Sequence, residues 1–172
     1  MTVEWTWEKT PDGQSRFVLG TVGENPLICF GINPSTAVPG QLDPTVTRVS
    51  KHAARTGHDS WTMLNVYPQI STDPKGMHLE LDPQLKELNE RHIAEHVAGR
   101  SLTIMAAWGT LVESRPHLRR LAHDIAALPE LANCTWVSLG TTTKAGHPRH
   151  PLYVKGDAPL IPFDIATYTT AT

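Results

Sequence analysis

The sequence predicts an α/β protein in which helices cover both faces of a mostly parallel β-sheet. Two patterns lead to this fold class. Apolar runs without a polar face, typical of strands that are covered on both sides, alternate along the chain with segments of helical periodicity. Successive units of this kind build parallel sheets through right-handed crossovers.

The first 24 residues are expected to form a β-hairpin ahead of this core. Apolar and polar residues alternate from Val3 to Glu8, which is the pattern of a half-buried strand. The turn-forming residues Pro11-Asp12-Gly13 follow, and an extended pattern resumes from Arg16 to Val22. Residues 1–24 are therefore assigned to an N-terminal hairpin.

The α/β core is expected to span residues 25–153. The run from Leu27 to Ile32 has no polar face and is predicted to be the central strand. A helix should follow from Asp43 to Thr56, because Asp43 can cap its first turn and Gly57 stops it. Later strands are expected at residues 61–66, 102–107 and 135–139, and later helices at residues 83–98 and 116–128.

The remaining chain, residues 154–172, is expected to be an extension of irregular structure or a short edge strand. It contains Pro159 and Pro162, and its Thr- and Ala-rich end is expected to fray. A chain of 172 residues without a linker, repeat or low-complexity tract is predicted to be one domain, residues 1–172.

Composition narrows the possible partners. With 15 Lys and Arg against 17 Asp and Glu, the net charge of −2 attracts neither nucleic acid nor anionic membranes as a whole. Any contact with nucleic acid needs a local basic patch. Cys29 and Cys134 lie in apolar runs and are expected to be buried free thiols, which together with the absence of a signal sequence favours the cytoplasm. No membrane partner is expected, and the sequence does not indicate an oligomeric state.

Two asparagines stand at the expected carboxyl ends of parallel strands, where ligands bind in such sheets. Pro34 restricts Asn33 to extended conformations, so its amide either orients a water or a ligand edge, or bonds its own backbone in a turn. Asn65 is expected to be buried and must find partners, either in the adjoining backbone or in a ligand.

Other residues near these strand ends have a binding interpretation and a structural one. Tyr67 and Trp108 either stack on a planar ligand or pack in the core. Arg48 either reaches a phosphate or carboxylate or stays solvated, and Asp43 is a helix cap or a catalytic carboxylate. Gly31, Pro34 and Ser35 complete the first strand end.

The late loop TTTKAGHPRHPLY contains two His-Pro pairs. His147 and His150 invite a metal interpretation, but no third and fourth ligand is recognisable, so no metal is predicted. A histidine here can instead donate a hydrogen bond to negative charge on a leaving group, or bond a neighbouring carbonyl. Lys144 and Arg149 are candidate phosphate contacts or solvated side chains.

Several motifs together resemble one known family. The stretch FGINPSTA, then Asp43, Thr45 and Arg48, and later MLNVYP, AAWG and LGTTTKAGHPRHPLY are similar to the bacterial domain-of-unknown-function family 1643. The similarity runs from the first buried strand to Tyr153. It implies membership of that family and no particular activity.

A more distant resemblance implies a fold. The residues Gly31-Ile32-Asn33-Pro34 resemble the first motif of the uracil-DNA glycosylase superfamily, especially its mismatch-specific branch. Asn65, Trp108-Gly109 and the two His-Pro pairs follow in the order of that superfamily's later motifs. The resemblance implies a three-layer sandwich around a short, mostly parallel sheet.

The same resemblance implies hydrolysis of an N-glycosidic bond. Asn33 would position the water, Asn65 would read the base edge, and His147 or His150 would stabilise the departing base, while an aromatic residue stacks on it. Pro148-Arg149-His150-Pro151 replaces the serine and wedge residue usual in that superfamily, which leaves open which histidine takes the role.

The expected function is hydrolysis or binding of a nucleobase-containing ligand, and the alternative is a non-catalytic module that binds a nucleotide or modified base. The partner would be a nucleotide, nucleoside or nucleic acid held by a local basic patch, and no cofactor is expected. The catalytic candidates are Asn33, His147 and His150, and the ligand-binding candidates are Gly31, Pro34, Ser35, Asp43, Arg48, Asn65, Tyr67, Trp108, Lys144 and Arg149.

Overall fold

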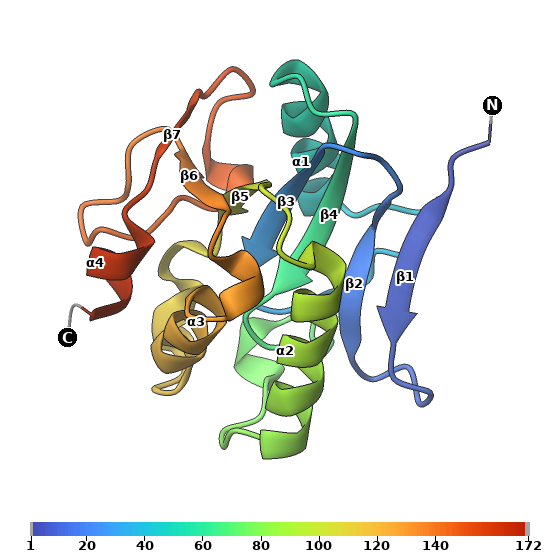
Figure 1. Ribbon diagram of the computed structural model, residues 1–172. Coiled ribbons are helices and arrows are strands. Elements are labelled where there is room, and N and C mark those ends of the chain that lie inside the picture. Colours follow the sequence, from blue (N-terminus) through green and yellow to red (C-terminus); the bar gives the residue numbers. More distant parts are fainter. Residues whose placement is uncertain (1, 171–172) are drawn as a thin grey trace.

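A seven-stranded β-sheet runs through the protein, whose computed structural model describes residues 2–170 (Figure 1). In chain order the strands are β1 (Trp5–Lys9), β2 (Arg16–Thr21), β3 (Pro26–Gly31), β4 (Ser60–Asn65), β5 (Thr103–Ala106), β6 (Thr135–Leu139) and β7 (Leu160–Pro162). Across the sheet their order is β1-β2-β4-β3-β5-β6-β7. The predicted α/β class, the N-terminal hairpin and the central place of β3 are confirmed.

Parallel pairing is confined to the middle of the sheet. Strands β4, β3, β5 and β6 pair in parallel, whereas β1 with β2, β2 with β4 and β6 with β7 pair antiparallel. The antiparallel pairing of β2 with β4 places the first residue of β2 beside the last residues of β4. This edge of the sheet therefore receives the ends of the parallel strands and the start of β2.

Helices cover both faces of the sheet, as Figure 1 shows. Alternate residues of β3 point to opposite faces, so Leu27 and Cys29 pack with α1 (Pro44–Arg55), while Ile28 and Phe30 face α2 (Pro83–Val97) and α3 (Leu118–Ala126). The short helix α4 (Ile165–Thr170) packs against α3. Short 3-10 helices lie at η1 (Pro74–Gly76), η2 (Gly109–Ser114), η3 (Pro129–Leu131) and η4 (Pro151–Tyr153).

Local signals fix where α1 begins and ends. The Asp43 carboxylate accepts a hydrogen bond of 2.8 Å from the Val46 N–H, and Pro44 occupies the first helical turn. The helix ends at Arg55, and Gly57 has the left-handed φ of +84° that terminates it. Asp43 is therefore the cap that the sequence predicts, and it fixes the start of α1 at one edge of the sheet.

Three expectations about local structure need correction. Cys29 is buried, but Cys134 precedes β6, is half-buried and donates from its Sγ to the Arg100 carbonyl. The helix expected at 116–128 starts at Leu118. The end expected to fray forms α4 as far as Thr170, because Asp164 caps the helix by accepting from the Thr167 N–H at 3.1 Å and Tyr168 packs against Trp108. Residues 171–172 lie outside the described residues. No helix within residues 2–170 is long and apolar enough to cross a membrane.

Candidate functional site

A cavity of about 760 Å³ opens where β3, β4 and β5 end, on the face of the sheet that α1 covers. Its volume lies within the range of ligand pockets. Its walls come from the loops after these strands, the start of α1 and the late loop before η4. Its lining includes Arg16, Gly31, Asn33, Pro34, Ser35, Thr36, Asp43, Thr45, Met63, Asn65, Ser71, Trp108, Gly109, Arg149, His150 and Tyr153.

Gly31 keeps the floor of the cavity open. It ends β3 and pairs with Asn65, the last residue of β4. A Cβ atom at position 31 would lie 3.1 Å from the Asn65 Oδ1, which is closer than side chains normally pack. Gly31 therefore leaves room for the Asn65 amide and for any group that contacts it.

Asn65 supplies an unsatisfied hydrogen-bond donor to this floor. Its side chain is only 1% exposed, and its Nδ2 is buried without a hydrogen-bond partner. The Asn65 main-chain carbonyl accepts from the Asn89 side chain at 2.9 Å, which fixes this end of β4 against α2. A buried amide N–H without a partner is costly, and this one lies at the edge of the cavity.

Asn33 holds the upper wall of the cavity together. Its Nδ2 donates to the carbonyls of Gln69 and Ser71 at 3.2 and 3.0 Å, which ties the loop after β3 to the loop after β4. It also contacts the Pro34 carbonyl at 3.1 Å. The Asn33 Oδ1 makes no hydrogen bond within residues 2–170. Asn33 therefore offers the cavity an acceptor, which suits a water molecule or an N–H group.

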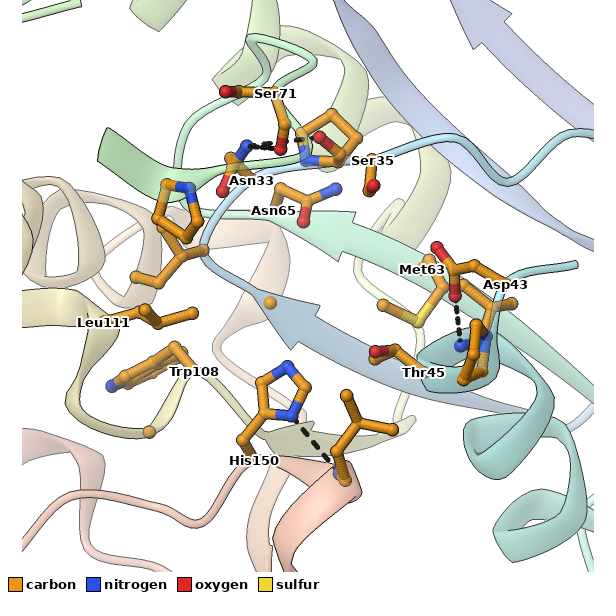
Figure 2. Close-up of a pocket in the computed structure, with 18 of the residues that line it drawn as sticks. Asn33, Ser35, Asp43, Thr45, Met63, Asn65, Ser71, Trp108, Leu111 and His150 are labelled. Atoms are coloured by element: carbon orange, nitrogen blue, oxygen red, sulfur yellow. Dashed lines mark hydrogen bonds between the residues drawn. The ribbon is translucent and has the colours of Figure 1, made fainter. Parts of the chain in front are cut away.

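His150 presents a defined nitrogen to the cavity. Its Nδ1 accepts a hydrogen bond of 3.2 Å from the Leu152 N–H, so the neutral ring carries its proton on Nε2. Burial lowers the pKa of His150, and the Asp43 charge opposes this effect only in part. Figure 2 shows the His150 ring and the Asn65 amide on opposite sides of the cavity, pointing toward one another. The neutral imidazole is thus a hydrogen-bond donor that faces Asn65.

The other late histidine, His147, does not line the cavity. It is 1% exposed, and its Nδ1 lies 2.9 Å from the Tyr168 hydroxyl. Its Nε2 lies 2.9 Å from the Glu113 carboxylate. Both ring nitrogens are used inside the fold, and His147 joins the late loop to α4 and η2.

Three further candidates line the cavity with some of their polar atoms already bonded. Trp108 donates from its indole Nε1 to the Tyr168 hydroxyl at 2.9 Å, so it offers only its ring. Asp43 caps α1. Arg149 donates to the carbonyls of Thr141 and Thr142. Trp108 can contact a planar group, while Arg149 chiefly holds the late loop.

Three of the predicted ligand-binding residues lie away from the cavity lining. Tyr67 is fully buried, and its hydroxyl bonds His78 at 2.7 Å and accepts from the Asp82 N–H at 3.2 Å. Arg48 donates to the Val154 carbonyl at 3.1 Å and so fastens η4 to α1. Lys144 is exposed in the turn of the late loop. Of Arg48, Lys144 and Arg149, only Arg149 lines the cavity.

The cavity also contains a cation that the sequence analysis missed. Arg16 begins β2, yet its side chain is only 3% exposed. Burial lowers the pKa of its guanidinium to about 10, and the nearby Asp43 charge counteracts this shift. Antiparallel β2 brings Arg16 to the edge where the parallel strands end. The signal in the sequence was a lone arginine directly before an apolar strand.

No metal centre accompanies these groups. Within residues 2–170 there is no cluster of three or more His, Cys, Asp or Glu side chains that could hold a metal ion. His147 and His150 face different surroundings and share no ligand position. The polar side chains that line the cavity carry amide, imidazole, hydroxyl, guanidinium and carboxylate groups.

Comparison with known proteins identifies one related family. Residues 16–152 match the sequence model of the family described as a protein of unknown function (DUF1643). No curated protein and no solved structure matches the chain. The matched residues include Arg16, Asn33, Asn65 and His150, so the cavity belongs to the part of the chain that defines the family.

Proposed function

This chain belongs to the DUF1643 family, and we propose that its cavity binds a nucleobase-containing ligand and hydrolyses the N-glycosidic bond of that ligand. One observation carries the proposal: Asn33, Asn65 and His150 line the same cavity. Their free atoms are an acceptor, a buried donor and an imidazole N–H. These are the groups needed to place water, read a base edge and stabilise a leaving base.

The proposed reaction replaces the bond from sugar to base by a bond from sugar to water. A water held by the Asn33 Oδ1 would attack the anomeric carbon, and the electrons of the broken carbon–nitrogen bond would pass to the base. The His150 Nε2–H would donate a hydrogen bond to the charge that grows on the base. The proton that the water loses would reach the released base through solvent.

The proposal extends to the type of fold. We propose that the three layers and the order of the motifs follow the uracil-DNA glycosylase arrangement, with His150 in the position of the late histidine. The cavity edge formed by β3, β4 and β5 supports this, because it brings Asn33, Asn65 and Trp108 to one place. The proposed setting is the cytoplasm, with a nucleotide, nucleoside or nucleic acid as partner.

Base release is the direct test. Purified protein would be incubated with uracil-, hypoxanthine- and mismatch-containing oligonucleotides and with free nucleotides, and released base would be quantified. We expect release from at least one substrate, with Asn33→Ala and His150→Ala each reduced about 100-fold. The matched control is His123→Ala, on the outer side of α3, which should retain full activity. No release from any substrate would remove the enzymatic proposal.

A non-catalytic binding module is the second candidate, and one observation favours it. Asp43 is the only carboxylate among the cavity-lining residues, and it is hydrogen-bonded to the first turn of α1. Apart from this helix cap, the cavity lining contains no carboxylate that could take a proton from water. This candidate predicts saturable binding without turnover when a nucleotide panel is titrated by calorimetry. Failure of every nucleotide and nucleoside to bind would contradict it.

A further inference from the structure

Arg16 is anchored as a fixed part of the cavity. Its main-chain N–H donates to the Pro68 carbonyl at 3.0 Å, beyond the end of β4. Its Nη1 donates to the Ala37 carbonyl at 3.1 Å, in the segment between β3 and α1. The first bond fixes the backbone at the start of β2, and the second holds one nitrogen of the guanidinium in place.

The charge of Arg16 is left unpaired by the rest of the protein. Within residues 2–170 the guanidinium forms no salt bridge, and its buried Nε has no hydrogen-bond partner. A guanidinium has five N–H donors, and only Nη1 has a protein acceptor here. Burial of a cation without a direct partner is unfavourable, and an anionic ligand beside Arg16 would reduce this cost.

Three other arginines differ from Arg16 in their surroundings. Arg119 also has a buried Nε without a hydrogen-bond partner, but its guanidinium lies over the Tyr168 ring, 4.6 Å from the ring centroid, and the residue is only half-buried. Arg115 donates to four main-chain carbonyls through its three guanidinium nitrogens. Arg120 pairs with Asp124 and is 75% exposed. Arg16 therefore differs from these arginines in being buried and under-bonded at the same time.

The groups beside Arg16 complement an oxyanion. The side-chain hydroxyls of Ser35, Thr36 and Thr45 line the same cavity. The buried Nδ2 of Asn65 is a further donor on its floor. Asp43 is the opposing charge, but its carboxylate is already hydrogen-bonded to the Val46 N–H at the positive end of α1. The cavity that Arg16 lines therefore also holds hydroxyl and amide groups that can donate to an oxyanion.

We propose that Arg16 binds a phosphoryl group of the ligand, so that the cavity takes nucleotides in preference to nucleosides or free bases. This inference rests on the proposed function and defines its substrate class. Arginine matches the geometry of phosphate oxygens and binds them through charge-assisted hydrogen bonds. The ligand then spans the cavity, with its phosphoryl group at Arg16 and its base between Asn65 and His150.

The experiment compares uridine 5′-monophosphate, uridine and inorganic phosphate by calorimetry. The wild-type protein should bind the monophosphate roughly 10- to 100-fold more tightly than uridine. In Arg16→Gln this preference should fall to about 1, whereas the control Arg120→Gln should keep it. Equal binding of uridine and its monophosphate by the wild type, or an unchanged preference in Arg16→Gln, would overturn the assignment.

The outcomes separate this inference from the proposed function. Binding of uridine with no preference for the monophosphate would remove the role of Arg16 and leave the nucleobase site. If only inorganic phosphate binds, and Arg16→Gln abolishes that binding, the phosphoryl site at Arg16 would stand and the proposed nucleobase site would be removed. No binding of any of the three would remove both. If Arg16→Gln does not fold, two measurements on the wild type decide the question. They are its preference for the monophosphate over uridine and the competition of inorganic phosphate with the monophosphate.

Discussion

The two histidines of the late loop, His147 and His150, have the same local sequence and opposite surroundings. Each is followed by proline and lies between β6 and η4. His147 is buried with both ring nitrogens bonded to protein, whereas His150 bonds the loop through Nδ1 and leaves Nε2 to the cavity. One histidine is therefore suited to hold the fold and the other to meet a ligand.

The difference comes from what packs against each ring. The Tyr168 hydroxyl, from α4, pairs with His147 and also accepts from the Trp108 indole. His150 instead lies beside Gly109. A Cβ atom at position 109 would lie 3.3 Å from the Cβ atom of His150, so glycine leaves room for this side chain. A His-Pro pair stiffens a loop, but the neighbouring elements decide where its side chain points.

The largest expected effect is on stability at His147. In His147→Ala the buried Tyr168 hydroxyl loses a partner and a cavity remains, so unfolding free energy should drop by about 2–4 kcal/mol. Urea denaturation measures this change. His150→Ala should cost about 1 kcal/mol or less, because only the Leu152 N–H loses a protein partner. Equal losses in the two variants would contradict the division of roles.

The next effect isolates the hydroxyl that His147 shares with Trp108. In Tyr168→Phe the Trp108 Nε1–H and the His147 Nδ1 both lose their hydrogen-bond partner. We expect the free energy of unfolding to fall by about 1–3 kcal/mol. The matched control is Tyr153→Phe, at a side chain that is 80% exposed, which should change stability by less than about 0.5 kcal/mol. A Tyr168→Phe protein as stable as the control would show that this cluster does not stabilise the loop.

Much of the fold follows from local patterns in the sequence. The apolar runs of the four parallel strands and the Asp43 cap of α1 are short-range signals, and the structure contains the corresponding elements. Helix α4 has a cap as well, because Asp164 accepts from the Thr167 N–H at 3.1 Å, but a helix of six residues also depends on Tyr168 packing beside Trp108. Elements held by distant partners are thus the ones that the sequence does not reveal.

The site could be predicted where strand direction alone determines position. The carboxyl ends of parallel strands lie at one edge of the sheet. Because Asn33, Asn65 and Trp108 stand at or just after such ends, they line the same cavity. Arg16 escaped this rule because β2 is antiparallel to β4 and contributes its first residue to the same edge. The orientation of His147 and His150 in a loop follows from tertiary contacts, which no periodic pattern encodes.

A smaller effect is expected on the cavity side of the comparison. Gly31→Ala places a Cβ 3.1 Å from the Asn65 Oδ1, across the cavity from His150. It should weaken nucleotide binding about 10-fold, because the Asn65 amide must shift, with less than about 1 kcal/mol lost in stability. Calorimetry and urea denaturation measure the two changes. Gly156→Ala, where a Cβ meets nothing within 4 Å, is the control.

The smallest expected effect is the contribution of His150 to the pH dependence of stability. Burial lowers the pKa of His150 below its usual value of 6.5, so the unfolded chain binds its proton more readily than the folded one. The stability that neutral His150 contributes is present above pH 6.5 and is lost as the pH falls through its folded pKa.

Urea denaturation at pH 7 and pH 5 of wild type and His150→Gln separates this contribution from that of other histidines. Burial also lowers the pKa of His52, His58, His96 and His117, so both proteins should lose stability on acidification. The wild type should lose slightly more, because protonation of His150 also breaks its bond from the Leu152 N–H. If His150→Gln loses as much as the wild type, the ring at position 150 is not held neutral by its place in the cavity wall.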